Sequence, residues 1–199
     1  MKTLLTLLTL AGVAAAQQTY DIDSSHSSAQ FSVRHMMISN VKGEFTKVSG
    51  SIAYDPANPS ASKIDATLDT TTINTRDAKR DAHLKSPDFF DTTKFPLLTF
   101  HSKQVSKVGG KLQAKGDLTM HGVTREVVLD IDGPTPELKD PWGNLRFGVS
   151  ASTKLNRKDW GLGWNKALES GGVLVGEEVT ITLDIEAVRT AAPQTSAKR

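Results

Sequence analysis

"KLQAKGDLTMHGVTREVVLDID", residues 111–132, is the stretch that decides the fold. Apolar and small residues occupy alternate positions in its first half, and a period of two is typical of a half-buried β-strand. The letters "HGVT" then predict a tight turn, after which "REVVLDID" alternates again. The stretch therefore predicts an antiparallel hairpin with one apolar face. The residues expected on that face are Leu112, Ala114, Gly116, Leu118, Met120, Val127, Leu129 and Ile131.

The same alternation recurs along most of the chain. Residues 30–36 place Phe31, Val33 and His35 on one face, and residues 177–188 alternate throughout. Between Val41 and Tyr54 the apolar residues change phase, which predicts a β-bulge near residues 46–47. Turn signals separate about eight such segments, and they read "DPANPS", "VGG" and "DGPTPELKDPWGN".

One-sided strands joined by turns predict an all-β, mostly antiparallel fold. Only residues 76–85 form a convincing helix, and so short a helix cannot cover an eight-stranded sheet. A closed eight-stranded barrel or a curved two-sheet sandwich is therefore favoured. The inward positions mix small residues with phenylalanines, so the interior is either a tunnel or an interlocked solid core.

The stretch "RDAHLKSPDFFD", residues 80–91, departs from the strand pattern. Phe89 and Phe90 are adjacent, and adjacent side chains cannot both face one side of a strand. We expect this segment and the helix before it to lie over an open end of the barrel. One aromatic ring would seal the core and the other would face the lumen or its mouth. The alternative is a crossover helix that only plugs the barrel.

The first sixteen residues resemble an export signal. Lys2 is followed by an apolar run over residues 4–13, and three alanines then form a small-residue cleavage site before Gln17. The run is too short to span a bilayer. We expect a mature chain from about residue 17 in the periplasm or outside the cell, with residues 190–199 as a disordered tail. Without cysteine, the chain has neither disulfides nor a lipid-anchored cysteine.

Composition and motifs argue against several functions. The chain has 24 basic and 22 acidic residues, interspersed along its length, so nucleic-acid binding is not expected. It lacks the nucleophile elbow, the phosphate-binding loop and a cysteine nucleophile. We predict neither a cofactor nor a metal, because the histidines lack the close pairing of a zinc site. These histidines are His26, His35, His83, His101 and His121.

Six phrases in order resemble the YceI-like, polyisoprenoid-binding family. They are "FSVRH", "VKGEFTKVSGSIAYDP", "RDAHLKSPDFFDTTKFPLLTF", "GDLTMHGVTREVVL", "LNRKDWGLGWN" and "VGEEVTITLDIEAV". Together they cover about Thr19 to Arg189, so residues 17–189 are expected to form one domain. The resemblance implies an eight-stranded, lipocalin-like barrel whose apolar tunnel holds an extended isoprenoid or another long-chain amphiphile. It implies a carrier or storage protein, and export is common in the family.

On this basis we expect a set of side chains to line the tunnel, with plain core packing as the alternative for each. They are Phe31, Val33, Phe45, Leu68, Phe90, Phe100, Leu118, Met120, Phe147 and Leu155. A polar headgroup would lie at the mouth near His35, Asp81, His83 and Arg157. Arg157 would meet a phosphate or quinone oxygen, or would instead pair with Asp159 or Asp81.

The expected partners are one lipid ligand and, transiently, a membrane, and a homodimer is left open. Two other functions also remain open at this stage. The chain would be a secreted barrel enzyme that acts on a lipid, with His35 and Asp81 as candidate catalytic residues. Otherwise it would be a solid β-sandwich that works through protein contacts. Neither the identity of the ligand nor its direction of transport follows from the sequence.

Overall fold

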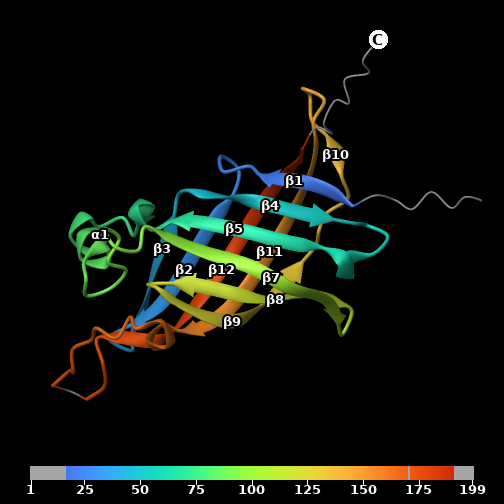
Figure 1. The fold of residues 1–199 in the computed structure, drawn as a ribbon. Coiled ribbons are helices and arrows are strands. Elements are labelled where there is room, and N and C mark those ends of the chain that lie inside the picture. The colour runs from blue at the N-terminus through green and yellow to red at the C-terminus, as the bar shows by residue number, and fades with distance from the viewer. Residues whose placement is uncertain (1–16, 170, 191–199) are drawn as a thin grey trace, which may run out of the picture.

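The structure is a computed structural model that describes residues 17–169 and 171–190 (Figure 1). The proposed export signal, residues 1–16, lies outside the described residues, as does the proposed tail apart from Thr190. The strands are β1 Gln18–Ile22, β2 Ser28–His35, β3 Ser39–Phe45, β4 Val48–Tyr54, β5 Lys63–Asp69, β6 Ile73–Asn74, β7 Leu97–Val108, β8 Lys111–Met120, β9 Val123–Asp132, β10 Leu138–Lys139, β11 Leu145–Asn156 and β12 Val175–Arg189. The helices are α1 Ala78–Lys85 and the 3₁₀ turns η1 Pro59–Ala61, η2 Thr70–Thr72 and η3 Arg157–Trp160.

The sheet closes on itself because β11 pairs with both β9 and β12. The ring runs β11, β9, β8, β7, β5, β4, β1 and β12. β2 continues the edge of β1 along β12, where Ile22 is paired with Ala187 and Ser28 with Asp184. The fold is thus the expected closed, eight-stranded antiparallel barrel rather than a two-sheet sandwich.

The phase change at residues 46–47 is a strand break rather than the expected bulge. β3 ends at Phe45 and β4 begins at Val48, and both side chains are buried. The chain changes partners there, because β3 is paired with β2 and β6 while β4 is paired with β1 and β5. Register shifts occur elsewhere, between Ser102 and Gln104 in β7 and between Val175 and Val179 in β12.

The hairpin of residues 111–132 forms as predicted, with β8 and β9 paired from Leu112–Ile131 to Met120–Val123. The predicted helix begins two residues later than expected. Asp77 caps it by accepting hydrogen bonds from the backbone N–H groups of Lys79 and Arg80, while Arg76 has a left-handed backbone with φ of 63°. Ser86 ends the helix, and Pro87 follows it.

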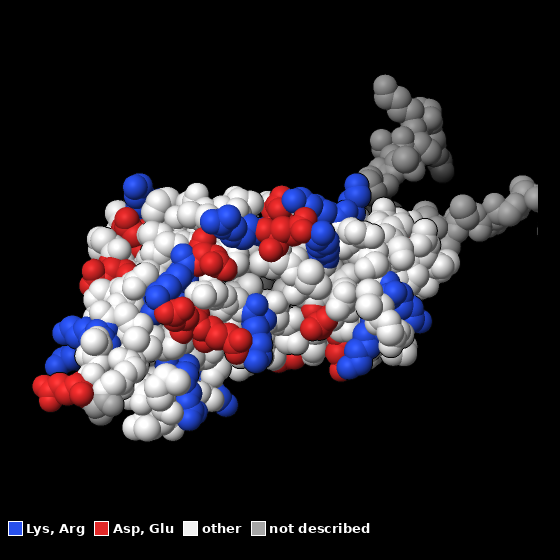
Figure 2. Space-filling view, turned by 90° about the horizontal axis from the view of Figure 1, so that it is seen from below, with Lys and Arg blue, Asp and Glu red and all other residues white. Residues whose placement is uncertain are grey.

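The barrel has two distinct ends. α1 and the loop after η3 lie at one end, and β10 lies at the other, near the C-terminal end of β12 (Figure 1). Basic and acidic side chains are interspersed over the face in Figure 2, which shows no broad field of one sign. Within the described ranges, no helix is long and apolar enough to cross a bilayer.

Candidate ligand-binding cavity

A cavity of about 220 Å³ lies inside the barrel, so the interior is not packed solid. Strand alternation produces its lining: Val179, Ile181 and Leu183 of β12 face inward, while Thr182 and Asp184 at alternate positions are exposed. Apolar side chains from the other strands complete the wall, and the polar lining residues are Gln30, Thr99, Thr153 and Arg157. A dry cavity of about 150 Å³ lined by Leu, Ile and Phe accepts benzene. The hollow therefore has room for an apolar guest.

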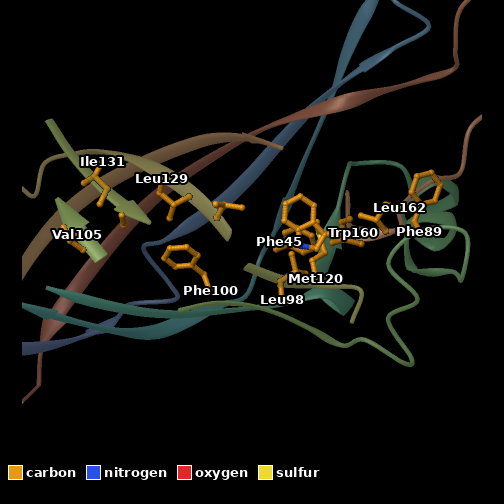
Figure 3. Packing of buried hydrophobic residues seen from close by; sticks show 13 residues of the cluster. Phe45, Phe89, Leu98, Phe100, Val105, Met120, Leu129, Ile131, Trp160 and Leu162 are labelled. Atoms are coloured by element: carbon orange, nitrogen blue, oxygen red, sulfur yellow. The ribbon is translucent and has the colours of Figure 1, made fainter. Parts of the chain in front are cut away.

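The buried side chains form an elongated layer around this space. In Figure 3, Val105 and Ile131 lie at one end of the cluster, Phe89 and Leu162 lie at the other, and Phe100 lies between them. The lining reaches from Ile22, Ile52 and Ile185 near β1 to Leu84 of α1. Along β12, the ten residue steps from Val175 to Ile185 correspond to about 33 Å of strand. An elongated guest fits this shape better than a round one.

Glycine helps to keep the interior open. The ring of Phe100 lies over Gly116, where a methyl group would come 2.7 Å from Cζ of the ring. The same methyl group would lie 2.4 Å from the carbonyl oxygen of His101, so only glycine fits there. Because Gly116 has no side chain, the phenyl ring lies against the wall and leaves the centre of the barrel free.

The two adjacent phenylalanines pack at the helical end of the cavity. Phe90 lies edge-on to Phe45, with ring centroids 5.6 Å apart, and Phe89 packs on Trp164 at 5.3 Å. Both rings line the cavity, and Phe89 is buried. They can do so because they lie on an irregular segment rather than on a strand, where alternate side chains face opposite ways. The expected division between a sealing ring and a lumen ring is therefore replaced by two lining rings.

An aromatic cluster occupies the opposite end. Tyr20 is buried and lies edge-on to Phe147 at 4.6 Å, and Tyr54 lies 5.6 Å from Phe147. The Tyr20 hydroxyl donates a hydrogen bond of 2.9 Å to Glu137, which also accepts one from Arg189. Burial raises the pKa of Tyr20, so its hydroxyl stays protonated as a donor. The bonds fix the aromatic layer that adjoins the cavity.

Arg157 is the charged residue of the lining, and its side chain is buried. Its guanidinium donates to the carbonyl oxygens of Gly176 at 2.9 Å, of Val175 at 3.4 Å and of Leu162. Asp159 and Asp81 were the carboxylates expected to pair with Arg157, and neither of them does so. Burial lowers the pKa of the guanidinium, although the nearby Glu177 opposes that shift. Arginine nevertheless keeps its charge, so Arg157 brings a cation to the edge of an apolar space.

Most of the residues that we expected in the tunnel do line the cavity. They are Phe31, Val33, Phe45, Leu68, Phe90, Phe100, Leu118, Met120 and Leu155, and Arg157, which we expected at the mouth, also lines the cavity. Whether each one touches a ligand stays a prediction, because their placement shows only that they face the hollow. Strand parity placed residues such as Phe31, Val33 and Leu118 on the inward face, whereas Phe90 was expected from the segment after the helix.

Four expected residues, three of them expected at the mouth and Phe147 in the tunnel, are not among the lining residues. His35 has the parity of Val33, but the lining on β2 ends at Val33, while Val175, the partner of His35 on β12, is part of the lining. Asp81 accepts hydrogen bonds from the backbone N–H and the hydroxyl of Thr75, before the helix. His83 is hydrogen-bonded to Asp88, and its ring lies edge-on to Trp164. Phe147 lies edge-on to Tyr20.

The sequence reasoning missed other lining residues. Val179, Ile181, Leu183 and Ile185 had the correct parity in the sequence, so alternation alone could have added them. Leu84 and Leu162 carry no such signal. They lie on a helix and after a 3₁₀ turn, and only the closure of the barrel brings them to the cavity.

One polar cluster at the β10 end also escaped the sequence reasoning. Ligand atoms of Asp23, His26 and Glu186 lie within 4.8 Å of one another, which is close enough to hold a metal ion. The guanidinium of Arg146 already bridges this group, at 2.7 Å from Asp23 and 2.6 Å from Glu186. Its charge neutralises the carboxylates, so the cluster is explained as an ion-pair network.

Comparisons with known sequences agree with this architecture. The sequence model of the YceI-like domain matches residues 20–187. A UPF0312 protein of Vibrio cholerae is 40% identical over 149 residues, which cover 74% of this chain and 78% of the relative. Protein YceI of Shigella flexneri is 36% identical over 188 residues, covering 94% and 95% respectively.

Solved structures share the barrel. A Campylobacter jejuni YCEI protein superposes with a TM-score of 0.66 at 32% identity, covering 79% of this chain and 90% of that one. A polyisoprenoid binding domain from Saccharophagus degradans superposes at 0.61 with 15% identity, covering 87% and 100%. At that identity the second match shows a common fold only. Since the domain match spans nearly every described strand, the chain belongs to the YceI-like family.

Proposed function

We propose that the protein is a non-catalytic carrier that holds one long-chain amphiphile, such as a polyisoprenoid or an isoprenoid quinone, in the barrel. The apolar cavity that follows the barrel from Ile22 to Leu84 carries this proposal. The description of the Saccharophagus degradans domain as polyisoprenoid-binding supports the ligand class. Transport, storage and sequestration of the lipid all use the same cavity.

Burial of the hydrocarbon supplies the binding energy. A tail that hides roughly 500 Å² of apolar surface gains about 12 kcal/mol. Association costs roughly 4–15 kcal/mol in lost freedom of motion. The two quantities are comparable, so binding is useful but exchangeable, as a carrier needs. Selection would act on length and girth, because apolar burial has no preferred direction.

Arg157 supplies the polar part of the proposed site. Its hydrogen bonds from Nε and both terminal nitrogens go to carbonyl oxygens, while the guanidinium has five N–H donors in all. A phosphate, carboxylate or quinone oxygen at the cavity edge would accept a charge-assisted bond from this group. The proposed ligand therefore has an oxygen-rich head and an apolar tail.

The composition of the lining favours binding over catalysis. Within the described residues, the cavity wall includes no histidine, carboxylate or serine. A general base must lie within hydrogen-bond reach of the proton that it removes. His35 and Asp81, the candidate catalytic residues, do not line the hollow. This supports the carrier over the alternative of a lipid-processing enzyme.

We also propose that the protein is exported, because residues 1–16 have the charge, apolar run and small-residue end of a signal peptide. Separating periplasmic, secreted and cytoplasmic fractions, followed by N-terminal sequencing, tests this part. A chain that begins at Gln17 outside the cytoplasm supports export. An uncleaved cytoplasmic chain contradicts it.

Solvent extraction of the purified protein tests the carrier itself. Mass spectrometry of the extract should find about one apolar molecule for each protein chain. The lipid-free protein should then take up a polyprenol or a quinone when these are offered. An empty extract, together with no uptake of a polyprenol, a quinone or a fatty amide, contradicts the proposal.

A further inference from the structure

The turn between β2 and β3 exposes three consecutive apolar side chains. The exposed fractions are 40% for Met36, 56% for Met37 and 75% for Ile38. Exposed apolar runs of this length do not favour folding, and they usually serve a function. We call residues 36–38 the apolar tip.

The backbone of the turn also argues for a functional role. A hydrogen bond from Ile38 N to His35 O closes it, and its two central residues have φ of 49° and 62°. Turns of this kind favour Asn and Gly, because positive φ crowds an ordinary side chain. Met36 and Met37 are unusual residues for a turn of this kind. The apolar tip is therefore not explained by the needs of the turn.

The charges of the hairpin closest to the tip are basic, while Glu44 lies further along β3 and Glu169 lies in the loop of residues 166–174, which approaches Met37. From Ser28 to Gly43 the hairpin has two basic residues, Arg34 and Lys42, and no acidic residue. Arg34 is exposed and donates to the carbonyl oxygen of Met37 and to Asn40. The acidic residues Glu177 and Glu178 of the adjoining β12 are paired with lysines, Glu177 with Lys158 and Glu178 with Lys154. An apolar tip with two flanking cations complements an anionic lipid surface.

The tip lies beside the cavity. Val33 lines the hollow, and Met36 is three residues further along, or about 10 Å of strand. The N–H of Met36 donates to Leu174, next to the lining residue Val175. A membrane at the tip would therefore lie close to the lining residues at this end of the cavity.

We propose that the apolar tip docks the barrel on anionic phospholipid membranes, with Met37 and Ile38 inserted and Arg34 and Lys42 against the headgroups. The docking site would serve the proposed carrier function. The proposal rests on that function only for the biological purpose of docking. Membrane binding itself requires no ligand in the cavity, so the two ideas can fail separately.

Vesicle co-sedimentation tests the docking. Vesicles of phosphatidylcholine alone are compared with vesicles that also contain phosphatidylglycerol. Wild-type protein should bind the anionic vesicles, and added salt should weaken that binding. Ile38→Asp should weaken it roughly tenfold or more, since it removes an inserted side chain and adds a negative charge. Lys42→Gln should also weaken it, by roughly fivefold.

The matched control is Leu138→Asp on β10. Leu138 is 64% exposed, and it belongs to β10, which lies at the opposite end of the barrel from α1 (Figure 1). This variant should bind vesicles as the wild type does. Equal losses for both aspartate variants, or wild-type binding by Ile38→Asp, overturn the proposal. A wild-type dimer that Ile38→Asp dissociates in sedimentation velocity also overturns it, because the tip would then join two copies.

A cavity variant separates docking from carrying. Leu118→Trp should reduce the ligand recovered by extraction but leave vesicle binding unchanged, since Leu118 faces the interior. Ile38→Asp should retain its ligand when it is extracted. If Leu118→Trp abolishes vesicle binding while the barrel stays folded by circular dichroism, docking depends on the bound lipid and the tip proposal is wrong.

Discussion

The phenyl ring of Phe31 on β2 lies against the backbone of Gly43, its direct partner on β3. A methyl group on this glycine would come 2.4 Å from Cζ of the ring and 2.7 Å from Cγ2 of Thr75. Aromatic rings often cover a glycine across a strand pair in this way. Because the glycine supplies the space, the ring stays on the wall and out of the lumen.

Gly43→Ala should therefore shrink the cavity. The new methyl group meets the ends of two side chains rather than backbone, so the ring of Phe31 can rotate toward the lumen. We expect less bound lipid per chain by extraction and a stability loss of about 1–3 kcal/mol by urea denaturation. Gly163→Ala is the control, because the nearest atom to its methyl group would be 3.9 Å away. If Gly43→Ala retains as much lipid as the wild type, the ring of Phe31 does not limit the space available to the ligand.

A pair of tryptophan substitutions distinguishes hollow from solid parts of the interior. Leu118 lines the cavity, whereas Phe147 packs among Tyr20, Tyr54 and Ile52. Leu118→Trp should displace the ligand with little change in melting temperature, because the indole occupies existing space. Phe147→Trp should destabilise by about 1–3 kcal/mol through overpacking. Equal destabilisation of the ligand-free proteins would mean that the lumen near Leu118 has no spare room.

Strand parity predicted the barrel wall well, and for a physical reason. A side chain on a strand must face one of two sides, so an alternating pattern names the inward residues without knowledge of the partner strands. Phe31, Val33 and Leu118 were assigned in this way and face the cavity. The same pattern favoured a closed barrel or a two-sheet sandwich, because nearly every strand had one apolar face to bury, and the resemblance to the YceI-like family implied the barrel.

Positions set by non-local contacts were not predictable. His35 has the correct parity, yet the lining on β2 ends at Val33, although Val175, the partner of His35 on β12, is part of the lining. Phe147 was assigned to the lumen, but Tyr20, which is distant in sequence, packs on it. Of the carbonyl partners of Arg157, Leu162 follows a 3₁₀ turn and has no periodic signal, while Val175 and Gly176 begin β12, far along the sequence. Parity gives the face of the sheet on which a side chain lies, but the pairing of the strands decides its position along the barrel axis.

Arg157→Lys should destabilise the barrel although it preserves the charge. The guanidinium joins three carbonyl groups, of Leu162, Val175 and Gly176, with donors in a planar fork. A lysine ammonium cannot reproduce that geometry, and a buried carbonyl without a partner costs about 1–3 kcal/mol. We expect a loss of about 2–4 kcal/mol by urea denaturation of the ligand-free protein.

Lys158→Arg serves as the comparison for Arg157→Lys, since Lys158 makes an exposed ion pair with Glu177. It should change stability by less than about 1 kcal/mol, as is usual for a surface pair. If Arg157→Lys were as stable as the wild type, the carbonyl bonds would contribute little. Arg157 would then be free to act on a ligand headgroup alone.

Asp140 should make the stability of the fold depend on acidity. Burial would raise its pKa, but hydrogen bonds from Asn144, Arg146 and the N–H of Trp142 outweigh burial and hold the pKa well below its ordinary value. A carboxylate with a lowered folded-state pKa stabilises the protein fully above its ordinary pKa near 4, and this contribution disappears as the pH falls further. Melting temperatures of the wild type should therefore decline from about pH 4 downward. Asp140→Asn should melt lower than the wild type at neutral pH and show a shallower decline, whereas Asp130→Asn, outside the network, should keep the wild-type slope. Parallel slopes for the wild type and Asp140→Asn would assign the acid sensitivity to other carboxylates.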